Sequence, residues 1–133
     1  MNETLKKLKL TTQNPILILN APEEYQEVIK DIESEIHTEI KDKYKFIQIF
    51  TKDLAELKEY VPSAVDALDG DGYLWVCYPK GTSKKYKKSD INRDSLFNEV
   101  QEYNFSGVTL VSISNDWSAF RIRHNDYIKS SKK

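Results

Sequence analysis

Apolar residues gather in short runs, and these runs alternate with longer stretches in which apolar residues recur every three or four positions. Ile16–Leu19 is apolar at every position, which is typical of a strand buried on both faces. Four further strands are expected over 46–50, 73–78, 108–113 and 117–123. A weaker strand is expected over His37–Ile40, before the charged turn 41–43.

The stretches between these strands predict helices with recognisable ends. Asn20 and the glutamate three positions later have the spacing of a capping box, so a helix is expected to start there and carry apolar residues as far as Ile36. Thr51 is expected to cap a second helix, which Pro62 should kink or split and Asp69–Gly72 should end. Two other helices are expected, a short one bearing Leu5, Leu8 and Leu10, and one capped by Asn92 and bearing Leu96, Val100 and Tyr103.

Strands that alternate with helices predict a three-layer α/β fold with a mostly parallel sheet and right-handed crossovers. The sheet is expected to hold about six strands and to end in an antiparallel hairpin. At 133 residues the chain supports one ordinary core and not two. We therefore expect a single domain over 1–128 and a basic tail over 129–133.

Composition narrows the chemistry that this fold can carry. The four glycines are too dispersed to form a phosphate-cradling loop. The single cysteine, Cys77, excludes an intrachain disulfide and every multi-cysteine zinc site, and it suits a reducing compartment. No apolar run approaches the ~20 residues that span a bilayer, and no secretory signal is recognisable. We expect a cytoplasmic protein with no membrane partner, and we assign it no cofactor and no metal.

Charge is balanced overall but distributed unevenly. The formal net charge is −1, yet residues 23–68 hold 12 acidic and 6 basic side chains. Residues 79–93 reverse this balance, because six lysines and arginines there face a single acid, Asp90. A local basic patch of this kind attracts phosphate groups or an acidic partner.

Three short motifs resemble those of a family of short, uncharacterised bacterial domains. They are Leu17-Ile18-Leu19-Asn20-Ala21-Pro22-Glu23-Glu24-Tyr25, Gly72-Tyr73-Leu74-Trp75-Val76-Cys77-Tyr78-Pro79-Lys80 and Asp116-Trp117-Ser118, similar to the family's "LLNAPxxY", "LWVxxPK" and "WSG" patterns. The resemblance spans nearly the whole chain, and it departs from the pattern at Ala119, where the family has glycine. It implies a Rossmann-like domain of the class I methyltransferase type with no established activity.

The chain lacks features that functional methyltransferases of this fold possess. Those enzymes place a glycine-rich turn after the first strand so that the backbone can approach S-adenosylmethionine, whereas this turn is Asn20-Ala21-Pro22. An acid should follow the second strand to hold the ribose, and Glu39 is a poor occupant of that position. The five residues between Ile40 and Phe46 are too few for a crossover helix. We therefore expect a trimmed sheet and weak or no binding of S-adenosylmethionine.

Four polar residues at expected strand ends are candidate ligand-binding residues: Asn20, Lys80, Ser83 and Asp116. In a parallel sheet, ligand sites form outside the carboxyl ends of the strands, and an antiparallel last strand would bring Asp116 to the same edge as Lys80. The competing interpretation is an exposed ion pair that only fastens the loop, worth about 0–1 kcal/mol.

The lysine-rich segment is the second candidate region. Lys84, Lys85, Lys87 and Lys88 surround Tyr86, a pattern that suits phosphate contacts and base stacking but also an ordinary solvated loop. We expect an exposed, mobile loop whose tyrosine lies outside the core, with only salt-sensitive, non-specific contacts to nucleic acid.

Other reactive residues have simpler interpretations. His37 and His124 stand without an evident catalytic partner and are read as surface residues. Cys77 lies inside an apolar strand and is read as buried and inert. Asp69 and Asp71 have the spacing that opens a calcium loop, but its remaining ligands are missing, so they are read as turn residues.

Two function classes remain open from the sequence. One is a non-catalytic binding or regulatory module, with a protein partner or a phosphate-containing ligand, on a degenerate methyltransferase-like scaffold. The alternative is an enzyme or a nucleotide- or phosphate-binding protein that uses the carboxyl edge of the sheet. No catalytic motif decides between them, because one fold supports many functions.

Overall fold

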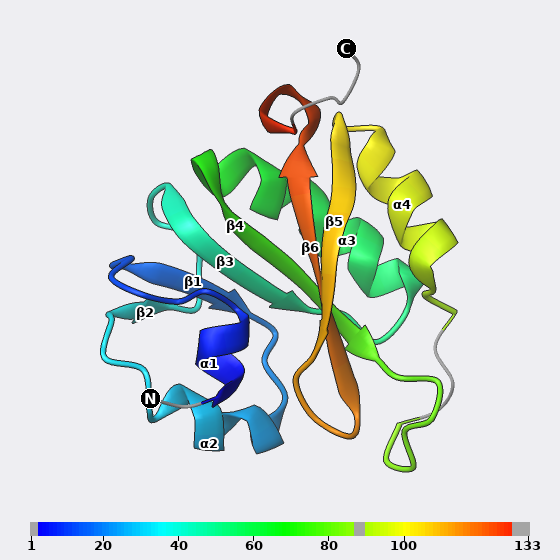
Figure 1. Cartoon of the computed structure of the whole chain (residues 1–133), viewed down its shortest axis with the longest axis horizontal. Helices are drawn as coiled ribbons and strands as arrows, with labels where there is room; N and C mark the ends of the chain where they lie inside the picture. Colours follow the sequence, from blue (N-terminus) through cyan, green and yellow to red (C-terminus); the bar gives the residue numbers. More distant parts are fainter. Residues whose placement is uncertain (1–2, 87–89, 129–133) are drawn as a thin grey trace.

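Six strands form one mixed sheet in the order β2-β1-β3-β4-β6-β5 (Figure 1). The computed structural model describes residues 3–86 and 90–128. Strands β1 to β4 are parallel, β6 is antiparallel to β4, and β5 is antiparallel to β6. The strands span Ile16–Leu19 (β1), Ile36–His37 (β2), Tyr44–Phe50 (β3), Leu68–Pro79 (β4), Phe105–Ser112 (β5) and Trp117–His124 (β6). This mostly parallel sheet with a C-terminal antiparallel hairpin confirms the predicted fold class.

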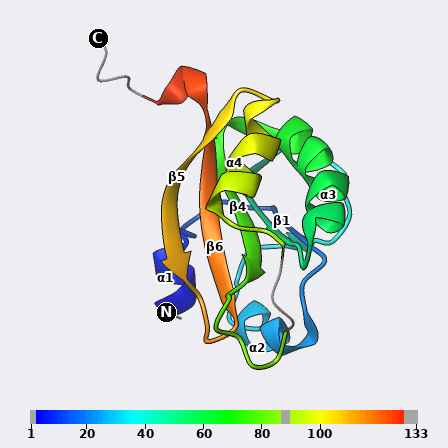
Figure 2. The same ribbon diagram turned by 90° about the vertical axis from the view of Figure 1, so that its right-hand side faces the viewer.

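Helices cover both faces of the sheet. Helices α3 (Leu54–Ala67) and α4 (Arg93–Gln101) lie on one face, and the short helix α1 (Glu3–Lys7) lies on the other (Figure 2). Alternate strand residues serve the two layers, so that Ile47 and Ile49 pack in the core under α3 and α4, whereas Phe46 and Phe50 pack in the core on the opposite face. No helix within 3–86 and 90–128 is long and apolar enough to span a bilayer.

The expected helix after β1 is much shorter than its apolar spacing predicts. Glu23–Tyr25 forms a 3-10 turn (η1), which is followed by the single turn Gln26–Ile29 (α2). Ile36 belongs to β2 instead. Asn20 does not cap this helix, because its backbone is left-handed, with φ of 61°, and its side chain turns toward β3. The prediction of a capping box was therefore wrong, and the Asn20 side-chain amide bonds the distant residue Phe50 instead.

The second helix was predicted closely, except at its ends. The N-cap of α3 is Asp53, whose side chain accepts a hydrogen bond from the Glu56 amide at 2.9 Å. Thr51 is not the cap: it is buried, and its hydroxyl donates to the Cys77 carbonyl at 3.0 Å. The helix is not split at Pro62 and runs to Ala67.

Asp69–Gly72 form no turn, contrary to the prediction, because β4 already begins at Leu68 and passes through them. Gly72 is required there, since a Cβ atom would lie 2.7 Å from the Lys45 Cα. Asp71 forms a bidentate pair with Arg123 of β6, in which Nε donates at 2.7 Å. This ion pair joins two strands and accounts for the carboxylate without a metal.

The second strand is shorter than expected, and it ends where Tyr44 holds the chain. The Tyr44 hydroxyl hydrogen-bonds the His37 Nδ1 at 2.6 Å and accepts from the Lys41 amide at 3.0 Å. Residues 38 and 39 form a bend, and residues 38–40 do not extend β2. As predicted, no helix separates β2 from β3, although these strands lie on opposite sides of β1. The sheet is trimmed at this point.

One expected helix cap is present, and a tryptophan not singled out from the sequence anchors the N-terminal segment. The Asn92 side chain accepts from the Ser95 amide at 2.9 Å and completes a capping box at the start of α4. The short N-terminal helix is tied to the sheet by Trp75, whose indole donates to the Leu8 carbonyl at 2.9 Å. The first contact fixes the start of α4, and the second holds the N-terminal segment against β4.

Candidate functional site

Successive strands are added on opposite sides of β1, so the strand order reverses at the carboxyl ends of β1 and β3. From β1 the chain proceeds to β2 on one side and to β3 on the other, which makes this the topological switch point where open α/β sheets bind ligands. Here the Asn20 Nδ2 donates to the Phe50 carbonyl at 2.8 Å and to the Glu56 Oε1 at 3.3 Å. One side chain therefore bridges the two strand ends.

Aromatic rings pack against the same edge of the sheet. The ring centroid of Tyr25 lies 4.8 Å from that of Phe50, and Phe50 in turn lies edge-on to Trp117 at 5.1 Å. The Tyr25 hydroxyl donates to the Gln48 Oε1 at 3.1 Å. All three rings are buried, and burial raises the pKa of Tyr25 far above its usual value. These rings belong to the core on the α1 face of the sheet, where it reaches the ends of β1 and β3.

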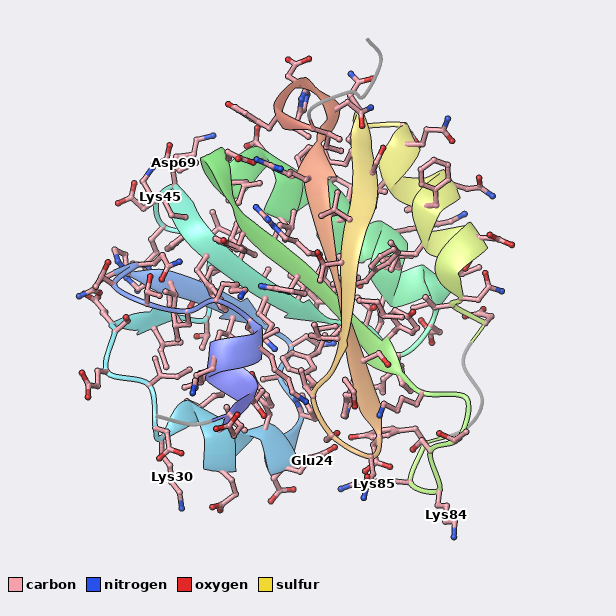
Figure 3. The ribbon with its side chains drawn as sticks, in the orientation of Figure 1. Glu24, Lys30, Lys45, Asp69, Lys84 and Lys85 are labelled. Carbon is pink, nitrogen blue, oxygen red and sulfur yellow. The ribbon has the colours of Figure 1, made fainter. Side chains whose placement is uncertain are left out.

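Glu24 is the charged centre of this edge. The Trp117 Nε1 donates to its carboxylate at 3.1 Å, the Tyr86 hydroxyl donates to the same oxygen, and the Lys85 Nζ lies 3.2 Å from the other (Figure 3). Burial acts to raise the pKa of Glu24, but these hydrogen bonds and one from its own backbone outweigh it and lower the pKa to about 2. The carboxylate is therefore ionised and fully engaged at neutral pH.

Tyr86 is not one of the buried core residues, as predicted, but it is partly buried and packs against the core. Its ring lies edge-on to Trp117 at 5.0 Å, and the side chain is only partly exposed. Burial and the bond to Glu24 raise the pKa of Tyr86 to about 12. The lysine-rich segment is thus fastened to the turn after β1. Lys84 points outward from it (Figure 3), and Lys87 and Lys88 lie outside the described residues.

The structure brings Lys80, Ser83 and Asp116 together but leaves Asn20 in the neighbouring cluster at the switch point. The Lys80 amide donates to the Asp116 carbonyl at 2.8 Å, and the Ser83 hydroxyl donates to the Asp116 carboxylate at 2.8 Å. The Lys80 ammonium bonds the Ser112 hydroxyl. Lys80 and Asp116 thus share an edge, as the topology predicts, but backbone bonding replaces the ion pair that was expected.

An open depression of about 640 Å³ lies over this group. Its lining is basic and polar, comprising Lys80, Thr82, Lys84, Lys85, Asn115 and Asp116. Two of its ammonium groups are already engaged, because Lys80 bonds Ser112 and Lys85 pairs with Glu24. The depression can therefore accept an anion mainly through Lys84.

Sequence reasoning missed Glu24, Glu56 and Trp117 as residues of the site. Glu24 lies 62 residues from Tyr86 and 93 from Trp117 along the chain, so no local spacing links them. The available signal was the resemblance itself, because Glu24 and Trp117 both fall within the quoted motifs.

Cys77 and His37 are both engaged by neighbouring side chains. Cys77 is fully buried, as predicted, and burial raises its pKa to about 12 while Gln48 donates to its sulfur at 3.4 Å. His37 is held between Tyr44 and Glu35. Within the described ranges, no group of three His, Cys, Asp or Glu side chains is placed to hold a metal.

Comparison with solved structures identifies the fold. The chain is similar to the N-methyltransferase NodS from Bradyrhizobium japonicum WM9, with a TM-score of 0.55 and 11% identity over 91% of this chain and 89% of that one. It is also similar to the ribosomal protein L11 methylase from Lactobacillus delbrueckii subsp. bulgaricus, with a TM-score of 0.54 and 9% identity over 91% and 75%. A methyltransferase from Pyrococcus furiosus has a TM-score of 0.54 and 10% identity over 92% and 79%.

At these identities the likeness concerns the fold alone, and it confirms the methyltransferase-like, Rossmann-like scaffold that the sequence resemblance implies. NodS has also been solved in complex with S-adenosyl-L-homocysteine, with a TM-score of 0.52 to this chain. No protein-family model matches the sequence, and no curated protein matches it.

Proposed function

We propose that this chain is a non-catalytic binding module built on a methyltransferase-like scaffold. The observation that carries the proposal is the hydrogen bond from Asn20 to the Phe50 carbonyl, which bridges β1 and β3 at the switch point. A ligand that enters between these strand ends in this topology must displace that bond and the Glu56 carboxylate behind it.

The turn after β1 supports the same proposal. A cofactor phosphate or carboxylate at this turn requires close approach of backbone amides. Pro22 has no amide hydrogen, the adjoining η1 is a single turn, and Glu24 places a negative charge there. A cofactor with a carboxylate would therefore meet both steric and electrostatic opposition.

The end of β2 offers no replacement for the acid that binds ribose. Glu39 lies two residues beyond the strand and is exposed, and no helix follows it before β3. In neighbours such as NodS this fold belongs to an enzyme. Here the switch point is surrounded by the Asn20 bridge between β1 and β3, by a turn that contains Pro22 and by a shortened β2. We therefore place the binding of a partner or ligand on other surfaces of the scaffold.

A thermal-shift screen tests this proposal against its alternative. A ligand at a hundred times its dissociation constant adds about 2.7 kcal/mol to stability, which is readily visible as a rise in Tm. We expect no rise with S-adenosylmethionine or S-adenosyl-L-homocysteine. A rise with either that saturates would overturn the non-catalytic assignment and favour an enzyme.

A second candidate function is binding of a phosphate-containing ligand or nucleotide, and the basic depression favours it. Three lysines line that depression, and the Lys84 side chain extends from the loop that carries it (Figure 3). We expect inorganic polyphosphate to raise Tm more than sodium chloride at equal ionic strength, and Lys84→Ala to reduce the difference. Lys45→Ala is the matched control, because Lys45 lies at the opposite end of the molecule. An equal response to both salts contradicts this candidate.

A further inference from the structure

Strand β5 forms one edge of the sheet, and among the described residues it pairs only with β6. Its eight residues, Phe-Ser-Gly-Val-Thr-Leu-Val-Ser, include no charge and no proline. Natural edge strands usually carry such residues because a row of unpaired backbone groups attracts another strand. A bulge at Gly107–Thr109 interrupts the first half, and the second half, from Thr109 to Ser112, is in regular register with β6.

A groove of about 620 Å³ runs between this edge and α4. Its described lining consists of Asn92, Asp94 and Phe97 from α4, Gly107 from β5 and Phe120 from β6. Gly107 is essential to the floor, since a Cβ atom would lie 2.2 Å from the Phe120 ring. The groove therefore has the Phe120 ring as its floor and α4 as one wall. Its other side is β5, whose outer edge pairs with no strand of the described residues.

Two large apolar side chains are left exposed at this groove. Phe97 is 41% exposed and Leu110 is 47% exposed, and Leu110 is the register partner of the floor residue Phe120. As register partners, Leu110 and Phe120 share a face of the sheet, the one on which Phe120 joins the core under α3 and α4. Apolar residues gathered beside an open strand edge are the features by which peptide-binding domains capture an extended segment.

We propose that this groove binds an extended peptide of a partner protein, which adds to β5 as a further strand. Alternate side chains of the peptide then point toward Phe97, Leu110 and Phe120, as strand periodicity requires. Asp94 is the only charged residue in the described lining, so the peptide carries a lysine or arginine beside its apolar residues. The proposal does not depend on whether the switch point binds a cofactor.

A single peptide strand fits this edge better than a second copy of the chain does. Two copies paired through β5 about an axis perpendicular to the sheet would place both α4 helices on the same face, directly beside the shared edge. Packed helices need about 8–10 Å between their axes, so the two α4 helices would have to be accommodated side by side on that face. Such pairing would also bring two Asp94 carboxylates to the same face, and the described groove lining contains no basic residue to offset them.

Selection from a random peptide library displayed on phage, with the full chain as target and its Leu110→Lys variant as counter-target, tests the proposal. A lysine on an edge strand is well tolerated, so this variant is expected to fold. We expect enriched peptides to alternate apolar residues and to contain lysine or arginine. A synthetic peptide of the enriched sequence should bind at least about tenfold more weakly to Leu110→Lys and to Phe97→Ser.

Matched controls separate docking from general stickiness. Ile40→Ser removes an apolar side chain of similar exposure, 43%, on a distant loop, and it should leave binding unchanged. Hydrogen exchange should show new protection of β5 amides when the peptide is bound. The proposal is overturned if no sequence is enriched over the Leu110→Lys counter-target, or if bound peptide leaves the β5 amides unprotected. It is also overturned if sedimentation shows a dimer that Leu110→Lys dissociates, since a second copy is then the occupant.

Discussion

Asn20 shows how one backbone conformation closes the switch point. Its φ of 61° places the amide over β3, where it donates to the Phe50 carbonyl at 2.8 Å. Asparagine adopts this left-handed region more readily than other residues with a Cβ atom, and glycine adopts it freely. The residue therefore has two separable roles, one in the backbone and one in the side chain.

Two substitutions at Asn20 separate these roles. Asn20→Gly loses only the side-chain bonds, whereas Asn20→Ala loses the bonds and is also strained, so we expect it to be less stable than Asn20→Gly by about 1–2 kcal/mol. Urea unfolding measures the difference. The same two substitutions at Asn104, whose φ is 66°, are the control for the backbone effect alone. Equal stabilities of the two Asn20 variants would show that the left-handed conformation is not required.

The ionised Glu24 carboxylate predicts a dependence of stability on pH. Its pKa is about 2 in the folded chain against 4.5 unperturbed, so its contribution is present in full above the unfolded value and is lost as pH falls through the folded one. Glu24→Gln should therefore destabilise the protein more at about pH 6 than at about pH 3. Urea unfolding of both proteins at the two pH values checks this.

Glu27→Gln is the matched control for that experiment. Glu27 lies on the same short segment but is 79% exposed and pairs only with Lys30. Its substitution should change stability little at either pH. If the Glu24→Gln difference is the same at both pH values, the carboxylate is not held by Tyr86 and Trp117 as the structure has it.

At the scale of elements, the C-terminal hairpin depends on a close approach between β5 and β6. A Cβ atom at Gly107 would meet the Phe120 ring at 2.2, 2.7 and 2.8 Å, and that ring is buried in the core under α4. Gly107→Ala should therefore lower the free energy of unfolding by about 1–3 kcal/mol, as overpacking does. Thermal unfolding followed by circular dichroism measures this.

Gly81→Ala provides the contrast, because no atom lies within 4 Å of a Cβ atom at Gly81. Its effect should stay within about 0.5 kcal/mol, as is usual at surface positions. A Gly107→Ala protein as stable as the Gly81→Ala protein would mean that Phe120 can turn away at little cost. The Phe120 ring, which forms the floor of the proposed peptide groove, would then be easily displaced.

Elements were more predictable from the sequence than their ends and partners were. The uniformly apolar Ile16–Leu19 was predicted as a buried strand and is one, because its burial on both faces leaves no other pattern. The helix expected after Asn20 shrank to single turns, because Ile36 is drawn into β2 and tertiary pairing overrides helical spacing. Asp69–Gly72 looked like a turn because the Arg123 partner of Asp71 lies 52 residues away.

The candidate site was predicted only in part, for the same reason. Strand ends located Lys80 and Asp116 on one edge correctly, since topology alone determines which loops meet there. The side chains that fill this edge, Glu24, Tyr86 and Trp117, come from three separate segments of the chain. Such convergence has no local signature in a single sequence.

At the scale of the whole molecule, the chain has a methyltransferase-like scaffold in which the elements beside the switch point are short. The chain aligns with NodS over 91% of its length, yet β2 has two residues and no helix links it to β3. The central claim is that the chain's own side chains, led by Asn20, occupy the place where this topology binds a ligand.

Isothermal titration calorimetry with S-adenosylmethionine tests that claim most directly. It should be done on the natural chain and on Asn20→Gly, with Asn104→Gly as the control for a second left-handed asparagine. The account predicts no saturable heat with the natural chain or with Asn104→Gly. Saturable binding to the natural chain with a dissociation constant in the micromolar range would contradict it, because a bridged crevice cannot admit the cofactor at that affinity.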